Sequence, residues 1–310
     1  MAAENLEPTI QHCIGRSLIH LPNSFSAANV TTGILMDKNS GSKKEAIDVL
    51  VRTQNGRPNF TLEVQKRKAE LEDSGSPNVD VLREIRNISK DTALFRVQRI
   101  DDAYVSEVLV VRGNSVVTAR LHSFRNEYAI AEEALMGFAT RVDALDSAES
   151  TAQGREFCLG SVKIRGDFSA EKANFLFRNG LGSQFDINVD TYAPDDHVPL
   201  LVRMSRPDSL LKIFDVRHTV LRARERTVAG MRAQEWLGAA QTSEDQGSTA
   251  LQFTLETMRP IPSKATPGIN LTFETAQPLE DGSQTKTLIS EQQAIQLWDS
   301  VVASLQSTSQ

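Results

Sequence analysis

The chain has 310 residues, of which 40% are hydrophobic and 24% are charged, with only 11 prolines and 17 glycines. This composition is typical of a globular protein, and the length exceeds what one hydrophobic core usually organises, so we expect two domains. The net charge of -6 argues against a nucleic-acid partner, because a surface that binds nucleic acid is strongly basic. No stretch approaches the roughly 18 to 20 consecutive apolar residues of a membrane span, and the first residues lack the pattern of a signal peptide.

The first half of the chain predicts a helix and then strands. Residues 60–72 mix Leu and Val with Glu, Lys and Gln, which are strong helix formers. Residues 105–111 and 115–121 are β-branched runs on either side of Gly113. This spacing predicts a β-hairpin.

The second half predicts strands and a closing helix. The helix is expected to begin after Ser290, an N-cap residue with Gln293 placed to complete a capping box. The strands are predicted from apolar alternation and β-branched content. They span residues 185–192, 200–204, 219–228, 251–257 and 270–275.

One large internal similarity organises the sequence. Cysteine, an apolar residue and glycine precede an alternating strand at Cys13 and again at Cys158, an offset of 145 residues. A second match aligns residues 133–145 with residues 293–305. Similarity at this spacing indicates two copies of one domain and not a solenoid, with chance similarity of short patterns as the alternative.

The fold class that follows is α+β, with two similar domains from an internal duplication. Each domain is expected to be a mostly antiparallel sheet with helices packed on one face. The N-terminal domain is expected at residues 1–147 and the C-terminal domain at residues 155–310. Residues 148–154 are small and polar, as a linker between domains should be.

Sequence signatures of catalysis and of cofactor binding are missing. There is no Gly-x-Ser-x-Gly elbow, no His-Glu-x-x-His helix and no phosphate loop, and Phe185 stands where a dinucleotide fingerprint beginning at Gly180 needs its third glycine. Asp186, Asn188 and Asp190 resemble the opening of a calcium loop. The sixth and twelfth positions of that loop lack the required Gly and Glu, so strand alternation explains the pattern better.

Cys13 and Cys158 belong to no Cys-x-x-Cys motif and have no histidine at ligand spacing. We therefore expect no metal site and no cofactor. A disulfide between the two cysteines is possible. Because each cysteine opens its own domain at an equivalent place, we do not expect the two sulfurs to meet.

A histidine and a row of arginines are the remaining candidate functional residues. His197 lies beside Asp195 and Asp196, and an enzyme would need a deep pocket that collects this histidine with Arg203. A solvated turn is the commoner reading of such a segment, so we expect no enzymatic activity. The weak candidates for partner binding are Arg222, Arg224 and Arg226, which share one face if residues 219–228 form a strand; an ordinary solvated sheet face is the alternative.

Several segments resemble a known protein family. Both repeated strand starts, the segment Thr227-Val-Ala-Gly230 followed by Glu235 and Trp236, and residues 297–305 resemble the immunity proteins paired with type VI secretion phospholipase effectors of the fourth lipase class. The resemblance covers residues 8–147 and 153–307.

The resemblance implies a non-enzymatic protein that binds and inhibits a cognate type VI lipase effector in the periplasm. No catalytic residue and no fixed binding motif is carried over from such a family. We hypothesise that a cleft between the domains holds the part of the lipase that opens to admit lipid. The alternative from another class is a periplasmic adaptor or lipid-binding module, which would need an apolar cavity of about 300 Å³ or more.

Overall fold

The computed structural model describes residues 7–37, 46–73, 81–124, 127–145, 156–192, 198–205, 218–241, 249–258, 263–275 and 288–308. These residues are rich in β-strands, and the recorded strand pairs are antiparallel. The expected α+β class with a mostly antiparallel sheet is therefore confirmed. Among the described helices, none is long and apolar enough to cross a membrane.

Contacts divide the chain into two compact units. We call residues 29–173 the middle unit, and residues 1–28 together with residues 174–310 the terminal unit, because it contains both ends of the chain. The segment expected as a linker, residues 148–154, lies outside the described residues. The division by contacts thus falls at different places from the division by sequence repeats.

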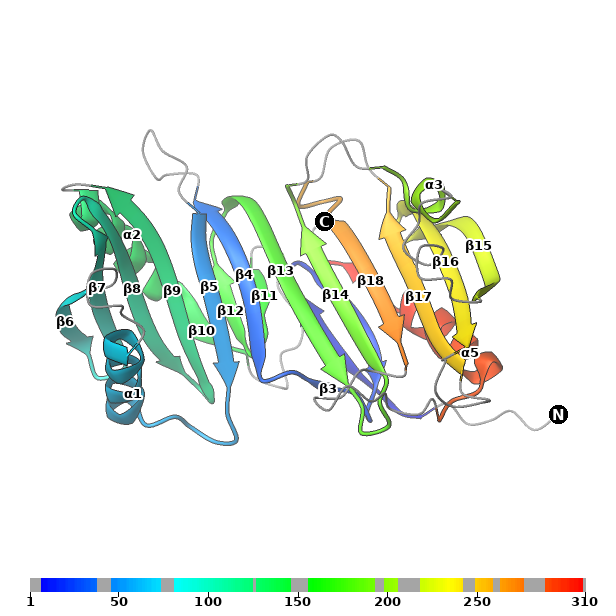
Figure 1. Ribbon diagram of the computed structural model, residues 1–310, viewed down its shortest axis with the longest axis horizontal. Helices are drawn as coiled ribbons and strands as arrows, with labels where there is room; N and C mark the ends of the chain where they lie inside the picture. Colours follow the sequence, from blue (N-terminus) through cyan, green and yellow to red (C-terminus); the bar gives the residue numbers. More distant parts are fainter. Residues whose placement is uncertain are drawn as a thin grey trace. The chain divides into compact units, whose positions relative to one another are not determined.

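The middle unit is built on an antiparallel sheet of strand order β6-β7-β8-β9-β5-β4 (Figure 1). A smaller sheet of order β10-β12-β11 accompanies it. The strands are β4 (Val30–Asp37), β5 (Ala46–Thr53), β6 (Val81–Ser89), β7 (Thr92–Ile100), β8 (Ala103–Arg112), β9 (Ser115–Phe124), β10 (Val142–Ala144), β11 (Glu156–Leu159) and β12 (Val162–Arg165).

Helices α1 (Phe60–Asp73) and α2 (Tyr128–Ala139) lie on opposite faces of the larger sheet in the middle unit (Figure 1). Leu71 of α1 packs in one cluster with Leu109 of β8, whereas the ring of Tyr128 in α2 contacts Tyr104. Positions 104 and 109 of one strand point to opposite faces. The expectation that helices cover one face is therefore wrong. Residues 105–111 of β8 are all buried, which is the burial pattern of a strand covered on both faces.

The terminal unit repeats this plan with a sheet of order β15-β16-β17-β18-β14-β13. A smaller sheet has the order β1-β2-β19, and β3 pairs with β13, a strand that crosses the limit between the units. The strands are β1 (Thr9–Ile14), β2 (Ser17–Pro22), β3 (Ser26–Ala27), β13 (Phe168–Arg178), β14 (Gln184–Asp190), β15 (His218–Val228), β16 (Met231–Gln241), β17 (Thr249–Thr257), β18 (Gly268–Glu274) and β19 (Gln306–Ser307).

The closing helix α5 (Glu291–Ala303) supplies much of the core of the terminal unit. It begins after Ser290, whose side chain accepts a hydrogen bond from the backbone of Gln293 while the Gln293 side chain accepts one in return. This capping box is the predicted one. Trp298 is fully buried and stands edge-on to the ring of Phe253 at 5.8 Å, so the helix is held by aromatic packing on the sheet.

Residues 200–204, expected as a strand, form helix α3 (Leu200–Ser205). A short apolar run has no periodicity that separates a strand from a helix. Pro199 suits a helix start, and its carbonyl accepts a hydrogen bond of 3.0 Å from the backbone of Arg203. The side chain of Gln234 on β16 accepts a bond of 3.0 Å from the backbone of Leu201. The helix therefore depends on a partner from a distant strand, which local sequence does not contain.

The other expected elements are confirmed with small changes at their ends. The expected helix 60–72 is α1, and the hairpin around Gly113 is β8 and β9. Burial alternates along β14, where Phe185, Ile187 and Val189 point inward as predicted. Cys13 and Cys158 are both disulfide-bonded. The sequence left open whether the cysteines are bridged, and the place of each at the start of a repeat did not decide it.

Candidate functional site

The arginine row predicted from sequence lies on β15, at the edge of the sheet of the terminal unit. Arg222, Arg224 and Arg226 alternate with residues of the other face, as period-2 geometry requires. A tight turn joins β15 to β16 through Ala229 (φ 49°) and Gly230 (φ 77°). Positive φ at both central residues is the geometry that matches the twist of a hairpin, and it places Arg224 directly opposite Glu235.

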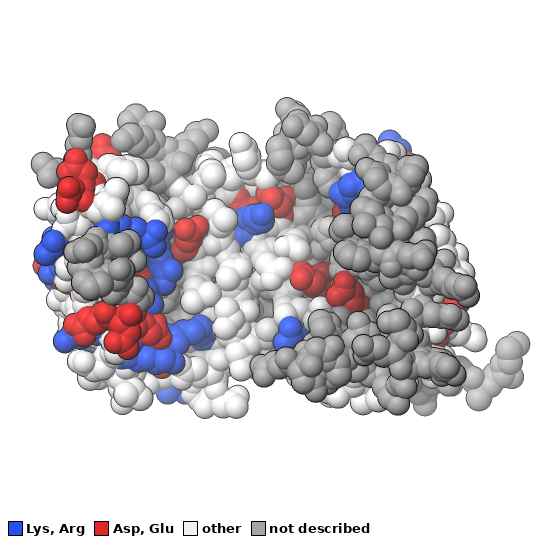
Figure 2. Space-filling view, viewed as in Figure 1, with Lys and Arg blue, Asp and Glu red and all other residues white. Residues whose placement is uncertain are grey.

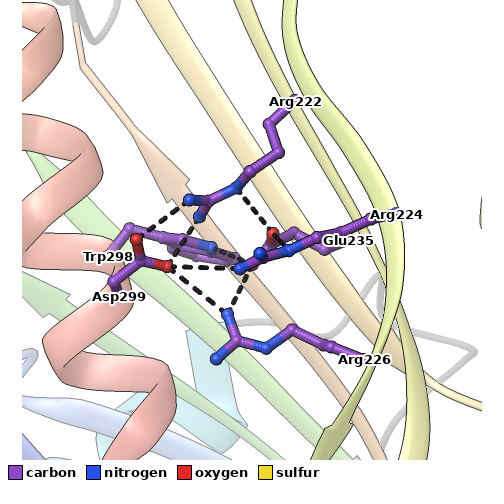
Figure 3. Close-up of polar contacts among 6 residues, drawn as sticks. All are labelled: Arg222, Arg224, Arg226, Glu235, Trp298 and Asp299. Atoms are coloured by element: carbon purple, nitrogen blue, oxygen red, sulfur yellow. Dashed lines mark hydrogen bonds and ion pairs between the residues drawn. The ribbon is translucent and has the colours of Figure 1, made fainter.

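Glu235 is the centre on which the three arginines converge (Figure 3). Its carboxylate is completely buried. Oε1 lies 2.7 Å from Nε of Arg222 and 2.9 Å from Nε of Arg224, and Oε2 lies 2.8 Å from Nη1 of Arg226. One carboxylate therefore fixes three guanidinium groups on the same face of the sheet.

Helix α5 adds a second carboxylate and a hydrogen-bond donor to this cluster (Figure 3). Asp299 receives two hydrogen bonds from Arg222, of 2.9 and 2.7 Å, and a longer one of 3.4 Å from Arg226. The indole Nε1 of Trp298 donates to Oε2 of Glu235 at 2.8 Å. Charged and bidentate bonds of this kind are the strong members of the hydrogen-bond family, so the cluster fastens α5 to the edge of the sheet.

Electrostatics keep both carboxylates of the cluster ionised. Burial by itself raises the pKa of Glu235, but the hydrogen bonds from Trp298 and Arg226 and the charge of Arg222 outweigh it and hold the pKa below its ordinary value. For Asp299 the bonds and charges of the arginines likewise outweigh burial and lower the pKa. Carboxylates held in this way do not exchange protons near neutral pH. The cluster is therefore suited to ion pairing and not to acid–base chemistry.

The three arginines differ in what they offer to a partner. The side chain of Arg224 is 45% exposed, against 21% for Arg222 and 20% for Arg226. Three guanidinium groups share two carboxylates, which leaves positive charge at the surface. Only Arg224 combines that charge with substantial exposure.

The middle unit contains two further clusters that the sequence did not suggest as sites. Glu107 on β8 is buried beneath Arg67 of α1 and Arg120 of β9, with the closest oxygen 2.6 Å from each Nε. Basic and acidic side chains alternate over this face (Figure 2). On the other face, Glu132 of α2 binds Arg96 at 2.6 Å and also binds Arg86. The sequence signal that could have predicted the first cluster is Glu107, a charged residue within the mostly apolar segment 105–111.

The remaining sequence candidates do not form a site among the described residues. Asp186 accepts hydrogen bonds from the amides of Asn174 (2.8 Å) and Asn188 (3.1 Å). No group of three or more His, Cys, Asp or Glu side chains in the described ranges is arranged to hold a metal ion. Arg203 pairs with Glu256. The segment of His197 lies outside the described residues, so the structure does not place it.

The fold and its ion-pair clusters together define a β-rich α+β protein whose charged groups hold helices onto antiparallel sheets. Residues 151–308, half of the chain, match the model for the C-terminal domain of Tle cognate immunity protein 4. The chain belongs to this family of immunity proteins. No curated protein matches the chain.

Solved structures share the fold over nearly the whole length. The apo immunity protein TplEi of the type VI secretion system from Pseudomonas aeruginosa is 17% identical, with a TM-score of 0.70 and coverage of 97% of both chains. A chain in the Tle4-Tli4 complex gives the same identity and TM-score, with coverage of 97% of this chain and 98% of that one. TplEi complexed with "L" peptide is 18% identical, with a TM-score of 0.66 and coverage of 97% of this chain and 99% of that one. At these identities the likeness shows the fold alone.

Proposed function

We propose that this chain binds and inhibits a cognate type VI secretion phospholipase, so that the producing cell is protected from its own toxin. The observation that carries the proposal is the family match over residues 151–308. The likeness in fold to a chain of the Tle4-Tli4 complex, over 97% of the present chain, supports it.

The protein acts by binding and not by catalysis. Membership of an immunity family supports this role. The two buried carboxylates of Glu235 and Glu107 are consistent with this role, because both are engaged by arginines in ion pairs that stabilise the fold.

The protein works in the periplasm, where an effector that degrades phospholipid would meet its substrate. Both cysteines are disulfide-bonded, and disulfides persist in oxidising compartments such as the periplasm. The proposed partner is therefore the effector after its delivery, and not a cytoplasmic precursor.

Arg224 is the member of the arginine row that we assign to partner binding. Its exposure of 45% and its place on an edge strand make its guanidinium accessible to a carboxylate of another protein. Arg222 and Arg226 hold α5 through Asp299. Arg224 also pairs with Glu235, but it lies 3.8 Å from Asp299 and is the most exposed of the three arginines.

The two halves of the chain, residues 1–147 and 155–310, are copies of one ancestral domain. Each copy contributes strands that occupy equivalent places in the two sheet orders, β6-β7-β8-β9-β5-β4 and β15-β16-β17-β18-β14-β13. In each copy a helix and then a short strand follow the last long strand. Shared order in both sheets supports duplication over chance similarity.

The experiment that tests the proposed function is a titration of the protein into a phospholipase assay that contains the lipase effector encoded beside it. Hydrolysis of fluorescent phospholipid vesicles is followed as the molar ratio rises. We expect activity to disappear near one inhibitor per enzyme, with a matching complex on a sizing column. Undiminished hydrolysis at large excess, together with separate elution of the two proteins, would contradict the proposal.

A further inference from the structure

We propose that the two repeated hairpins are exchanged between the halves of the chain, so that residues 8–28 complete the unit that contains the C-terminus. This exchange determines how each unit is completed and does not depend on the identity of the partner. As a consequence, residues 151–308, which match a family model, do not include the hairpin of residues 8–28 that completes their unit.

The two hairpins have the same local geometry. In β1 and β2, Ile14 pairs with Ser17 across a turn that begins at Gly15 (φ 62°). In β11 and β12, Leu159 pairs with Val162 across a turn that begins at Gly160 (φ 61°). A positive φ at the first turn residue favours glycine in both cases. The hairpins are therefore equivalent structures at an offset of 145 residues.

The first hairpin docks on the end of the chain. Leu18 of β2 pairs with Gln306 of β19, and the backbone of Thr308 donates a hydrogen bond of 3.0 Å to the carbonyl of Arg16. The backbone of His20 donates to Oγ of Ser304 at 2.9 Å. These contacts attach the first strands of the protein to the segment that follows α5.

The second hairpin docks in the equivalent way on the segment that follows α2. Ile164 of β12 pairs with Val142 of β10. The backbone of Leu145 donates a hydrogen bond of 3.0 Å to the carbonyl of Ser161, which corresponds to the bond between Thr308 and Arg16. Each hairpin therefore joins the helix and short strand that end the other half of the sequence.

Burial makes each hairpin part of the core that receives it. Ile14, Ile19 and Leu21 belong to the terminal unit and have no exposed surface, and the same holds for Leu159 and Ile164 of the middle unit. Without its hairpin, each unit would expose the apolar surface that these side chains cover. Since residues 1–28 reach the terminal unit from the far end of the sequence, that unit is complete only when both ends of the chain have come together.

Ile19 and Ile164 provide a matched test in the full chain. They occupy equivalent positions of the two hairpins and are equally buried. Hydrogen exchange is measured on Ile19→Ala and Ile164→Ala with the cysteines oxidised. We expect Ile19→Ala to accelerate exchange at least about 30-fold in β17, β18 and α5, and Ile164→Ala to do the same in β8, β9 and α2, because a cavity weakens the unit that contains it.

Tryptophan fluorescence supplies an independent readout, because both tryptophans, Trp236 and Trp298, belong to the terminal unit. Ile19→Ala should move the fluorescence transition in urea, and Ile164→Ala should leave it in place. The opposite assignment, or identical exchange patterns in both variants, overturns the proposal. If either alanine variant fails to fold, Ile19→Val and Ile164→Val apply the same comparison with a smaller cavity.

Discussion

The indole of Trp298 on α5 donates a hydrogen bond of 2.8 Å to the carboxylate of Glu235 on β16, and both residues are fully buried. A buried carboxylate is costly unless opposite charges and donors surround it. Glu235 has both, from Trp298 and from the arginines of β15. One residue of the sheet thereby determines where the last helix can pack.

Glu235→Gln should destabilise the terminal unit strongly. The substitution removes the charge that three guanidinium groups share and leaves them with Asp299 alone, so we expect a loss of about 3 kcal/mol in the free energy of unfolding. Urea denaturation followed by tryptophan fluorescence measures it, because both fluorophores lie in this unit.

Glu225→Gln is the matched control for that substitution. Glu225 lies on β15 and points to the other face, where it forms an exposed pair with Arg232 at 2.9 Å. Exposed pairs contribute little to stability, so the unfolding midpoint should not change. Equal losses in the two variants would show that the buried cluster has no special role.

Acid should weaken the protein through His12 before it affects the carboxylate cluster. Burial, with a smaller contribution from the charge of His20, lowers the pKa of His12 from 6.5 to about 4. Nε2 of His12 is buried and has no hydrogen-bond partner among the described residues. Folding favours the neutral ring of His12, so this contribution to the free energy of unfolding is fully present above about pH 6.5. It is lost as the pH falls toward 4, and the loss amounts to about 3 kcal/mol in total.

His12→Phe tests this assignment. The imidazole packs on Phe177 with 4.7 Å between ring centres, and the equivalent position of the second hairpin is Phe157, so an aromatic ring suits the site. The unfolding free energy of the variant should vary less between pH 6.5 and 4.5 than that of the parent. The exposed His122 provides the control substitution, His122→Gln, which should retain the parental slope.

The carboxylate cluster responds in a lower pH window. The pKa values of Glu235 and Asp299 are held below their ordinary values. Stabilisation from such groups is present above the ordinary pKa and is lost as the pH falls through the lowered one. The loss through His12 therefore begins first, and a denaturation series that crosses pH 4.5 separates the two contributions.

Asp186 predicts a pH effect of the opposite sign. Burial raises its pKa, and the charge of Glu274 adds to this, while the amides of Asn174 and Asn188 only partly compensate. The ionised form is therefore disfavoured in the folded protein. Asp186→Asn should raise the unfolding midpoint at pH 7, and the difference should shrink as acid protonates the parent. A lower midpoint at pH 7 would show that the carboxylate has a stabilising partner.

The turn between β15 and β16 contains an avoidable strain. Ala229 has a φ of 49°, a conformation that a side chain bearing Cβ disfavours and that asparagine tolerates better. Ala229→Asn creates the preferred Asn-Gly pair for this hairpin turn. We expect a gain of about 0.5 to 1 kcal/mol in the free energy of unfolding, measured by urea denaturation; an unchanged or lower value contradicts it.

Local sequence patterns correctly predicted those helices and strands whose determining residues lie within a few positions of one another. Ser290 and Gln293 are three positions apart, and the capping box was correct. For α3 the decisive contact is the hydrogen bond to Gln234, a residue on β16 that no local pattern connects to the run at residues 200–204. The assignment as a strand failed because tertiary contact, and not propensity, decides a short apolar segment.

The candidate site was predicted only in part for the same reason. Period-2 alternation correctly placed Arg222, Arg224 and Arg226 on one face. Their counter-charges come from β16 and from α5, and the distance in sequence between Arg222 and Asp299 gives no sign that they meet. Glu107 was more accessible to prediction, since a carboxylate within a continuous apolar run must find a buried partner.

Arg224→Gln should weaken the complex with the effector while leaving the fold intact. Arg224 exposes the largest share of its side chain among the three arginines, and Arg222 and Arg226 continue to hold Asp299 without it. If Arg224 meets a carboxylate of the effector, its loss should raise the Kd about 10-fold at low salt and reduce the salt dependence of binding.

The control for this change is Arg232→Gln, which removes the same charge from the neighbouring strand β16. Its side chain is 71% exposed and points away from the cluster. Kd values are measured by calorimetry at two salt concentrations. Equal weakening by both variants would indicate a general effect of net charge. Parental affinity in Arg224→Gln would show that Arg224 is not part of the interface. The titration against phospholipase tests separately whether the protein is an inhibitor.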